Sequence, residues 1–269
     1  MESRIPLEWS LFRAPFRRGR PPRWTRKKVV CRTSAFPYFL VMFKAEDLFD
    51  LGETAHADLF EGCEFAWEAL PRIKDYLAKH VKPALKNTCL GSAFIGDHVF
   101  IGEGTVVEDG VMIKGPAIIG RHCQIRHGAY FRENVIVGDD CVVGNSSELK
   151  NVLMFNKSVA PHFNYVGDTI LGHGTHLGAG VKISNVKLVG GTVKVMVGDT
   201  PRDTGLRKFG ALLGDHVEIG CNAVLNPGSI IGRGSVLYPN INWRGVLAAG
   251  KVVKNKGALD VVEKSPTSS

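Results

Sequence analysis

The chain has 269 residues, of which 44% are hydrophobic and 22% charged, and its mean hydropathy is close to zero. This balance is typical of a globular protein with one sizeable core, and no apolar run approaches the roughly 20 residues of a membrane-spanning helix. Thirty-one glycines favour a turn-rich, repetitive β-architecture over a helix bundle. Six cysteines without a Cys-x-x-Cys pair predict a reduced, cytoplasmic protein.

The formal net charge of +8 is concentrated at the start of the chain. Residues 1–41 hold ten Arg or Lys and two Glu, which leaves 24 basic and 24 acidic residues in the other 228. We expect this segment to be a basic, disordered arm. "RRGRPPR" (17–23) resembles an AT-hook, so the arm alone is a candidate for nucleic acid binding; it could also be a targeting segment. We favour a third interpretation, in which Met42 is the true start.

Residues 42–90 are predicted to form a short helical cap. Within it, residues 55–81 have a helical pattern that Pro71 breaks. The open end of a repetitive β-structure exposes unpaired edge groups. We therefore expect these helices to cover that end.

A six-residue repeat dominates residues 91–254. Stepping by six gives ten consecutive apolar positions, each preceded two residues earlier, from the second onward, by a small or β-branched residue: Ile95, Ile101, Val107, Ile113, Ile119, Ile125, Phe131, Val137, Val143 and Leu149. The phase slips after Phe155 and resumes at Tyr165, Leu171, Leu177 and Ile183, and again from Leu213 to Trp243. This hexapeptide pattern predicts a mainly β protein, a parallel β-helix with three short sides per coil.

Three hexads make one coil, so residues separated by three hexads should stack about 4.8 Å apart. Cys123 and Cys141 are then expected to stack in the core. Residues 184–211 have no hexad phase and are predicted to be a loop ejected from the coil. Residues 255–269 are expected to be a flexible tail.

Three cations occupy a turn position that elsewhere often holds glycine. Lys114, Arg132 and Lys150 follow one another at the spacing of one full coil and should form one column on one edge. Neighbouring charges there repel by about 1 to 3 kcal/mol, so the column needs either a bound anion or acidic partners. A phosphate site and three solvated side chains both remain open, and Lys208, at the end of the ejected loop, could reach the same edge.

The stretch "SVAPHFNYVGD" (158–168) interrupts the repeat and contains His162. The loss of phase should place this side chain on the outside of a distorted turn. A lone histidine is more often structural than catalytic. Beside a phosphate site, however, an imidazole with an ordinary pKa of about 6.5 is suited to take a proton at neutral pH.

These segments resemble one family of hexapeptide-repeat acyltransferases. "GNSSELKN" (144–151), "APHFNYVGD" (160–168), "LGAG" (177–180) and "KFGALLGDHVEIG" (208–220) follow the acetyltransferase half of the bifunctional bacterial enzyme that makes UDP-N-acetylglucosamine. The resemblance covers residues 95–254 and implies a left-handed coil. Residues 1–90 contain no Gly-rich nucleotide loop, so uridylyl transfer is not predicted.

The resemblance also implies a role for each matching residue. His162 would be the general base that deprotonates the sugar amine during its attack on acetyl-CoA, the co-substrate. Substrate contacts would come from Arg132, Lys150, Tyr165, Lys208 and His176, the last at a position where the family has Asn. Asn185 and Cys221 would lie at the acetyl-CoA site, and Val186 stands where the family has Tyr. No metal is implied.

The function predicted in this way is N-acetylation of an amino-sugar phosphate, above all glucosamine-1-phosphate, for UDP-N-acetylglucosamine or a related cell-envelope sugar. The family's usual assembly implies a homotrimer. One alternative is a non-catalytic, sugar-phosphate-binding or regulatory partner of a sugar nucleotidyltransferase. Another is a γ-class carbonic anhydrase, for which His122 and His127 have the right offset but no third histidine matches.

Overall fold

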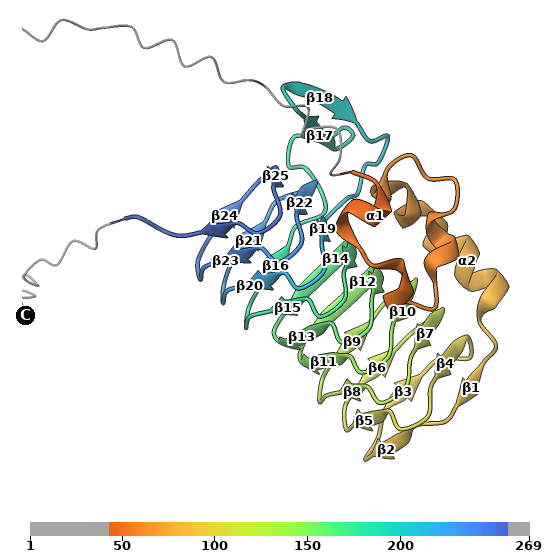
Figure 1. The fold of residues 1–269 in the computed structure, drawn as a ribbon. Helices are drawn as coiled ribbons and strands as arrows, with labels where there is room; N and C mark the ends of the chain where they lie inside the picture. Colours follow the sequence, from red (N-terminus) through yellow and green to blue (C-terminus); the bar gives the residue numbers. More distant parts are fainter. Residues whose placement is uncertain (1–42, 258–269) are drawn as a thin grey trace, which may run out of the picture. The chain divides into compact units, whose positions relative to one another are not determined.

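The computed structural model describes residues 43–257, which lie within the second of two units of the chain, Pro37–Ser269. The arm 1–41 and most of the tail lie outside the described residues. The described part is a parallel β-helix with a group of short helices packed against it (Figure 1). This confirms the fold class that the hexads predicted. No helix in this part is long and apolar enough to cross a membrane.

Three ladders of parallel strands form the sides of the coil. The cap side consists of β1 (Ala84–Leu85), β4 (Val99–Ile101), β7 (Ala117–Ile119), β10 (Val135–Val137), the ends of β12 (Glu148–Met154) and β14 (Tyr165–Leu171), β19 (Ala211–Leu213), β22 (Ser229–Ile231) and β25 (Val246–Leu247). The polar side consists of β3 (Phe94–Ile95), β6 (Met112–Ile113), β9 (Tyr130–Phe131), the starts of β12 and β14, β16 (Lys182–Ile183), β21 (Val224–Leu225) and β24 (Asn242–Trp243).

The third side is a separate sheet. Its strands are β2 (Thr88–Leu90), β5 (Val106–Glu108), β8 (Gln124–Ile125), β11 (Val142–Asn145), β13 (Val159–His162), β15 (His176–Leu177), β20 (Glu218–Ile219), β23 (Val236–Leu237) and β26 (Val252–Val253). The coil therefore begins at Ala84, before the predicted boundary at residue 91.

The hexad residues fill the interior of the coil. The predicted aliphatic positions from Ile101 to Leu149 are all fully buried. At one small inward position per coil, hydroxyl and thiol groups donate to a backbone carbonyl, as from Ser158 Oγ to Gly172 O over 2.7 Å. Cys123 and Cys141 occupy this position and are 1% and 0% exposed, so their predicted place in the core is confirmed.

The coil shortens where the repeat loses phase. Val135 pairs with Val152, and Val152 with Thr169, so each of these two coils is one residue shorter than three full hexads. The shortening begins at Asn151, before the predicted slip at Phe155. As a result Val166, not Tyr165, occupies the inward position above Leu149. The assignment of Tyr165 to the buried series was therefore wrong.

The helices precede the coil in sequence but cover its side. They are α1 (Ala45–Leu48), η2 (Leu51–Glu53), η3 (Ala57–Phe60), η4 (Ala66–Arg72), which contains Pro71, and α2 (Ile73–His80). Their apolar residues, such as Trp67 and Leu70, pack on outward side chains of the cap side, such as Leu153 and Leu212. The expectation that they close the end of the coil was wrong, because this side presents outward aliphatic residues that need burial.

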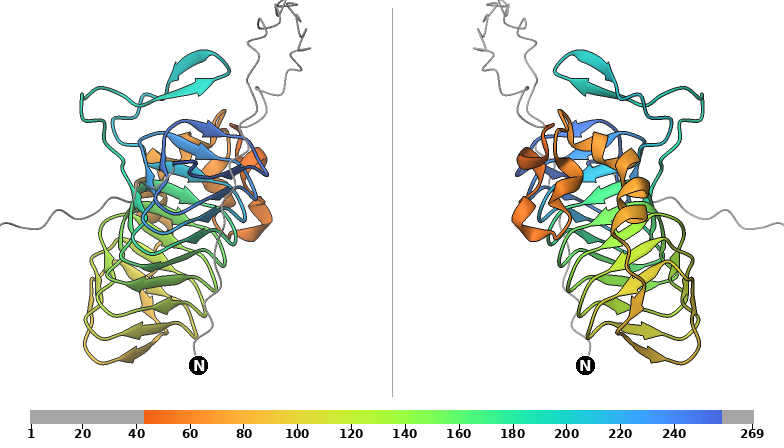
Figure 2. Two further views of the ribbon diagram at one scale, coloured as in Figure 1. Left: turned by 90° about the vertical axis from the view of Figure 1, so that its left-hand side faces the viewer. Right: turned by 90° about the vertical axis from the view of Figure 1, so that its right-hand side faces the viewer.

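The predicted loop leaves the coil after Ile183 and returns at Ala211, which already belongs to β19. Ile170 pairs directly with Leu212, and Leu212 pairs with Ile230 at the regular spacing of three hexads, so the whole loop is inserted into a single coil. It contains an antiparallel hairpin, β17 (Lys194–Val197) and β18 (Thr200–Asp203). The hairpin projects beyond the coil (Figure 2).

Candidate functional site

His162 lies at the corner between the third side and the polar side. Its Cα pairs with that of Asn145 in the coil below, and its side chain is exposed. Pro161 before it is buried, and Phe163 after it has a φ of 53°, a left-handed conformation that turns the chain sharply. The imidazole has no hydrogen-bond partner among residues 43–257. The predicted outward position of this histidine is therefore what the structure shows.

Asn164 holds this corner together from inside the coil. It occupies a small inward position, stacked on Ser147, and is 2% exposed. Its side-chain carbonyl accepts from His162 N at 3.1 Å, and its amide donates to Gly178 O at 2.8 Å. Ser147 below it also bonds to the next coil, through Ala160 O, but only the amide of Asn164 has a separate donor and acceptor for Gly178 O and His162 N. No motif in the sequence pointed to this residue, although it interrupts a series of small residues.

The predicted column of cations is present at the next corner, between the polar side and the cap side. The register of β6, β9 and β12 places Lys114, Arg132 and Lys150 above one another. Lys114 Nζ lies 5.1 Å from the centre of the Tyr130 ring. The two upper cations have acidic partners, one of the two ways in which such a column was expected to be stabilised.

The acidic partners of these two cations are glutamates. Arg132 Nη1 lies 3.0 Å from Glu148 Oε1, and Lys150 Nζ lies 3.3 Å from Glu133 Oε1. The hydrogen bond that Arg132 donates to Glu148 raises the pKa of its guanidinium group. Burial by itself raises the pKa of the Glu133 carboxyl group. Its backbone hydrogen bond and Lys150 outweigh this effect, so the pKa is lowered overall. The corner is thus a nearly balanced ionic cluster.

Tyr165 faces outward on the polar side, directly above Glu148. Burial raises the pKa of its hydroxyl, and the carboxylates of Glu148 and Asp168 raise it further against the opposing effect of Arg132 and Lys150. The hydroxyl therefore remains protonated at neutral pH and can donate a hydrogen bond. Tyr165 and the ionic cluster lie on the same surface, and Tyr165 closely follows His162 in the chain.

Asp168 is a second residue that the sequence analysis did not identify. It is 5% exposed with a φ of 48°, and its carboxylate accepts hydrogen bonds from the side-chain amides of Asn151, at 3.0 Å, and of Asn185. The three residues lie in successive coils and form a column at the Lys150 corner. The Asn185 side chain is thus engaged in this column, and its predicted place at the acetyl-CoA site stays a prediction.

The remaining predicted residues lie in two other places. Lys208 is exposed at the base of the ejected loop and pairs through a β-bridge with Val186, beside Asn185. His176 projects from the third side, where its Nδ1 lies 2.9 Å from Glu218 Oε2. Cys221 is exposed at the His162 corner two coils above His162, and it lines a mostly apolar groove of about 280 Å³ with His176 and Tyr238.

The predicted residues therefore form two groups on adjacent sides, and His162 lies at the corner between them. Tyr165, Arg132 and Lys150 could bind an anionic sugar through a hydroxyl and two cations. The groove with His176 and Cys221 could hold an apolar chain. Within residues 43–257 no three His, Cys, Asp or Glu side chains gather as metal ligands would.

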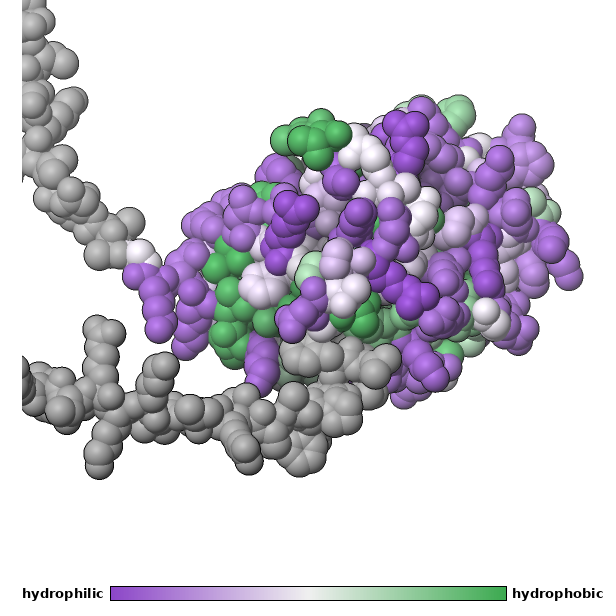
Figure 3. Space-filling view, turned by 90° about the horizontal axis from the view of Figure 1, so that it is seen from above, coloured by the Kyte–Doolittle hydropathy of each residue, from purple (hydrophilic) through white to green (hydrophobic). Residues whose placement is uncertain are grey.

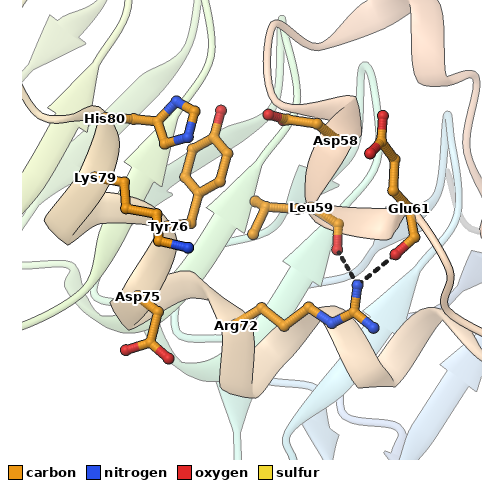
Figure 4. A pocket seen from close by; sticks show the side chains of 8 residues that line it. All are labelled: Asp58, Leu59, Glu61, Arg72, Asp75, Tyr76, Lys79 and His80. Atoms are coloured by element: carbon orange, nitrogen blue, oxygen red, sulfur yellow. Dashed lines mark hydrogen bonds between the residues drawn. The ribbon is translucent and has the colours of Figure 1, made fainter.

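A separate depression lies on the helical cap, between η3 and α2 (Figure 4). Its polar groups bond to neighbouring groups: Tyr76 Oη lies 3.0 Å from His56 Nδ1, and Arg72 Nη1 donates to Glu61 O at 2.5 Å. Burial and Asp58 raise the pKa of Tyr76 to about 12. The depression contains none of the predicted site residues. The face of the molecule seen from above the view of Figure 1 is largely hydrophilic, with separate apolar patches (Figure 3).

Comparison with known proteins finds similarity over the middle of the coil. A family model described as the GMPPB C-terminal domain matches residues 113–199. A bifunctional sugar-1-phosphate nucleotidylyltransferase/acetyltransferase of Sulfurisphaera tokodaii is 39% identical over 82 residues, 30% of this chain and 20% of that protein. The bifunctional protein GlmU of Methanococcus maripaludis strain C5 is 32% identical over 112 residues, 42% of this chain and 27% of that protein.

Solved structures with a similar fold include the acetyltransferase domain of PglB from Neisseria gonorrhoeae in complex with acetyl coenzyme A. The match covers 66% of this chain and 58% of that one at 15% identity, with a TM-score of 0.31. The chain spans between 20% and 27% of the length of the two curated relatives. Over the matched residues, the resemblance to bifunctional nucleotidylyltransferase/acetyltransferases is confirmed.

Proposed function

We propose that the protein is an acetyl-CoA-dependent N-acetyltransferase that acts on an amino-sugar phosphate, with glucosamine-1-phosphate as the first acceptor to test. One observation carries this proposal: His162, whose backbone N–H is held by Asn164 and whose imidazole is exposed, lies beside a surface that holds Tyr165, Arg132 and Lys150. A base and an anion-binding surface are the two parts that acetylation of a phosphorylated amino sugar requires.

In the proposed reaction His162 takes a proton from the amine of the sugar as its nitrogen attacks the thioester carbonyl of acetyl-CoA. A backbone N–H of the coil stabilises the resulting oxyanion. The carbon–sulfur bond then breaks, the leaving thiolate takes up the proton, and the products are the N-acetylated sugar phosphate and free CoA. Arg132 and Lys150 hold the phosphate after partly releasing their glutamates, and Tyr165 donates to the sugar or the phosphate.

The groove beside Cys221 would receive the coenzyme, and Asn185 would lie near its acetyl group. His176 would contact the sugar, and Lys208 would contact the same substrate from the base of the loop. Because the two groups face different sides of the coil, a neighbouring copy would have to complete each site. We therefore also propose a homotrimer, in which the three subunits are related by a threefold axis, and a cytoplasmic location, where acetyl-CoA and sugar phosphates are both present.

The test is release of free thiol from acetyl-CoA in the presence of glucosamine-1-phosphate at pH 7 to 8. His162→Ala should lower kcat by about 10²- to 10⁴-fold because the general base is lost. The matched control is His98→Ala, which removes an exposed histidine at another corner of the coil. Absence of thiol release across a panel of amino-sugar phosphates would contradict the enzymatic function.

A second candidate is a non-catalytic sugar-phosphate-binding module. The observation that favours it is that His162 has no carboxylate partner among the described residues that would orient its imidazole as a base. Calorimetric binding of glucosamine-1-phosphate without thiol release would support this module.

A further inference from the structure

The ejected loop is anchored to the helical cap by a continuous stack of side chains. Arg202 on β18 places its guanidinium carbon 4.1 Å from the centre of the Phe65 ring. The Phe65 ring in turn lies parallel to Trp67, with centroids 4.5 Å apart and planes 1° from parallel. Arg202 also lies 3.4 Å from a carboxylate oxygen of Glu64. A guanidinium placed over an aromatic ring is held by a cation–π attraction.

The series of ring contacts continues to the segment in which the loop returns to the coil, just before β19. Trp67 is 2% exposed, and its ring lies 6.3 Å from that of Phe209, which is fully buried. Phe209 follows Lys208 directly, and its N–H donates to Asn185 O at 2.9 Å. The stack therefore begins on the hairpin and ends at the two loop residues that the proposed function uses.

Backbone hydrogen bonds within the loop connect the anchored hairpin to the rest of the loop. Val193 N donates to Leu206 O at 2.7 Å, and Thr204 N donates to Val193 O at 3.1 Å. Val193 and Val195 are each 1% exposed. The loop is thus held as a unit between its base and the cap, whereas a free insertion of this length would sample many conformations.

We propose that Arg202 and Phe65 are positioning residues, which hold the ejected loop on the helical cap so that Lys208 keeps its place at the amino-sugar phosphate site. This inference rests on the proposed function and adds a role for the cap. The cap acts on the site through the loop, because Arg202 of the loop contacts Glu64 of the cap, a residue far away in the sequence.

The experiment combines hydrogen exchange with kinetics. In Arg202→Ala the amides of Val193 and Thr204 should exchange about fivefold faster, because loss of an exposed cation–π contact shifts an equilibrium by about that factor. The KM for glucosamine-1-phosphate should rise about fivefold while kcat changes less than twofold. Phe65→Leu should have the same two effects. Phe65→Tyr, which keeps the ring, should have the exchange rates and KM of the unaltered protein.

The matched control is Lys194→Ala, which removes a cation from the other strand of the hairpin, opposite Asp203. It should leave both exchange and KM unchanged. Unchanged exchange in Arg202→Ala would overturn the anchoring, and faster exchange with an unchanged KM would overturn the positioning role.

If the unaltered protein releases no thiol, the proposed function fails, but the anchoring is still decided by exchange. Calorimetric affinity for glucosamine-1-phosphate then replaces KM as the second measurement. A protein that does not bind this sugar phosphate at all overturns the positioning role.

Discussion

The cap side and the polar side of the coil have the same backbone geometry but differ in whether their outward side chains are buried. On the cap side the outward residues Ile136, Leu153, Ile170, Leu212 and Ile230 are all fully buried, in one cluster with apolar residues of the helices and of the ejected loop. On the polar side the outward residues at β9, β12, β14 and β16 are Tyr130, Glu148, Tyr165 and Lys182, and all four remain partly or fully exposed.

The comparison shows that the inward hexad residues build the coil, while the outward residues decide what each side does. An outward aliphatic row stabilises the protein only when something covers it. An outward polar row remains available to a ligand. The following variants test this division, in order of decreasing expected effect.

Leu153→Ala should have the largest effect on stability. Leu153 is fully buried between the coil and the cap, so truncation leaves a cavity and should lower the free energy of unfolding by about 2 to 5 kcal/mol. The measurement is denaturant unfolding. Met112→Ala, at an outward position of the polar side that is 37% exposed, should cost about 0.5 kcal/mol. Equal losses in the two variants would contradict the division.

Asn164→Leu should disturb the His162 corner. It keeps the side-chain size, but leaves His162 N and Gly178 O without their partner, at about 1 to 3 kcal/mol of stability. It should also lower kcat, because His162 is no longer held. Ser158→Ala removes a buried hydrogen bond at another corner and should leave kcat unchanged at a comparable loss of stability. An unaltered kcat in Asn164→Leu would show that this amide only stabilises the fold.

Tyr165→Phe should raise the KM for the sugar phosphate about fivefold through loss of one hydrogen bond, with kcat little changed. Because the pKa of Tyr165 is raised, this ratio of KM values should stay constant from pH 7 to 9. Tyr130→Phe, on the same side two coils below, is the matched control and should change KM less than twofold. A similar effect of both variants would argue against a specific role of Tyr165.

The smallest effect concerns pH and the cap. Burial lowers the pKa of His56 below its ordinary value of 6.5, against the attraction of Asp58. Between the folded-state pKa and 6.5 the unfolded chain binds more protons, so the free energy of unfolding should decrease as the pH falls below 6.5. His56→Asn should flatten this dependence in thermal unfolding between pH 7 and 5. An unchanged slope would assign the pH dependence to other groups.

Much of the candidate site could be predicted from the sequence because stacking in a coil is arithmetic. The column of Lys114, Arg132 and Lys150 and the outward position of His162 both follow from spacing. The partners of these residues could not be found in that way. Glu133 and Glu148 lie between the hexad positions. The column of Asn151, Asp168 and Asn185 depends on a spacing one residue short of three hexads, which appears only once the coil has shortened.

The sequence by itself determined the β-helix, its buried rows and its ejected loop, because a six-residue period of apolar residues has one way to bury them all. The tertiary structure decided where the cap lies, that its Phe65 meets Arg202 of the hairpin, and that Asn164 holds the His162 corner. These contacts join segments far apart in the chain, and no local pattern specifies which outward row a separate group of helices will cover.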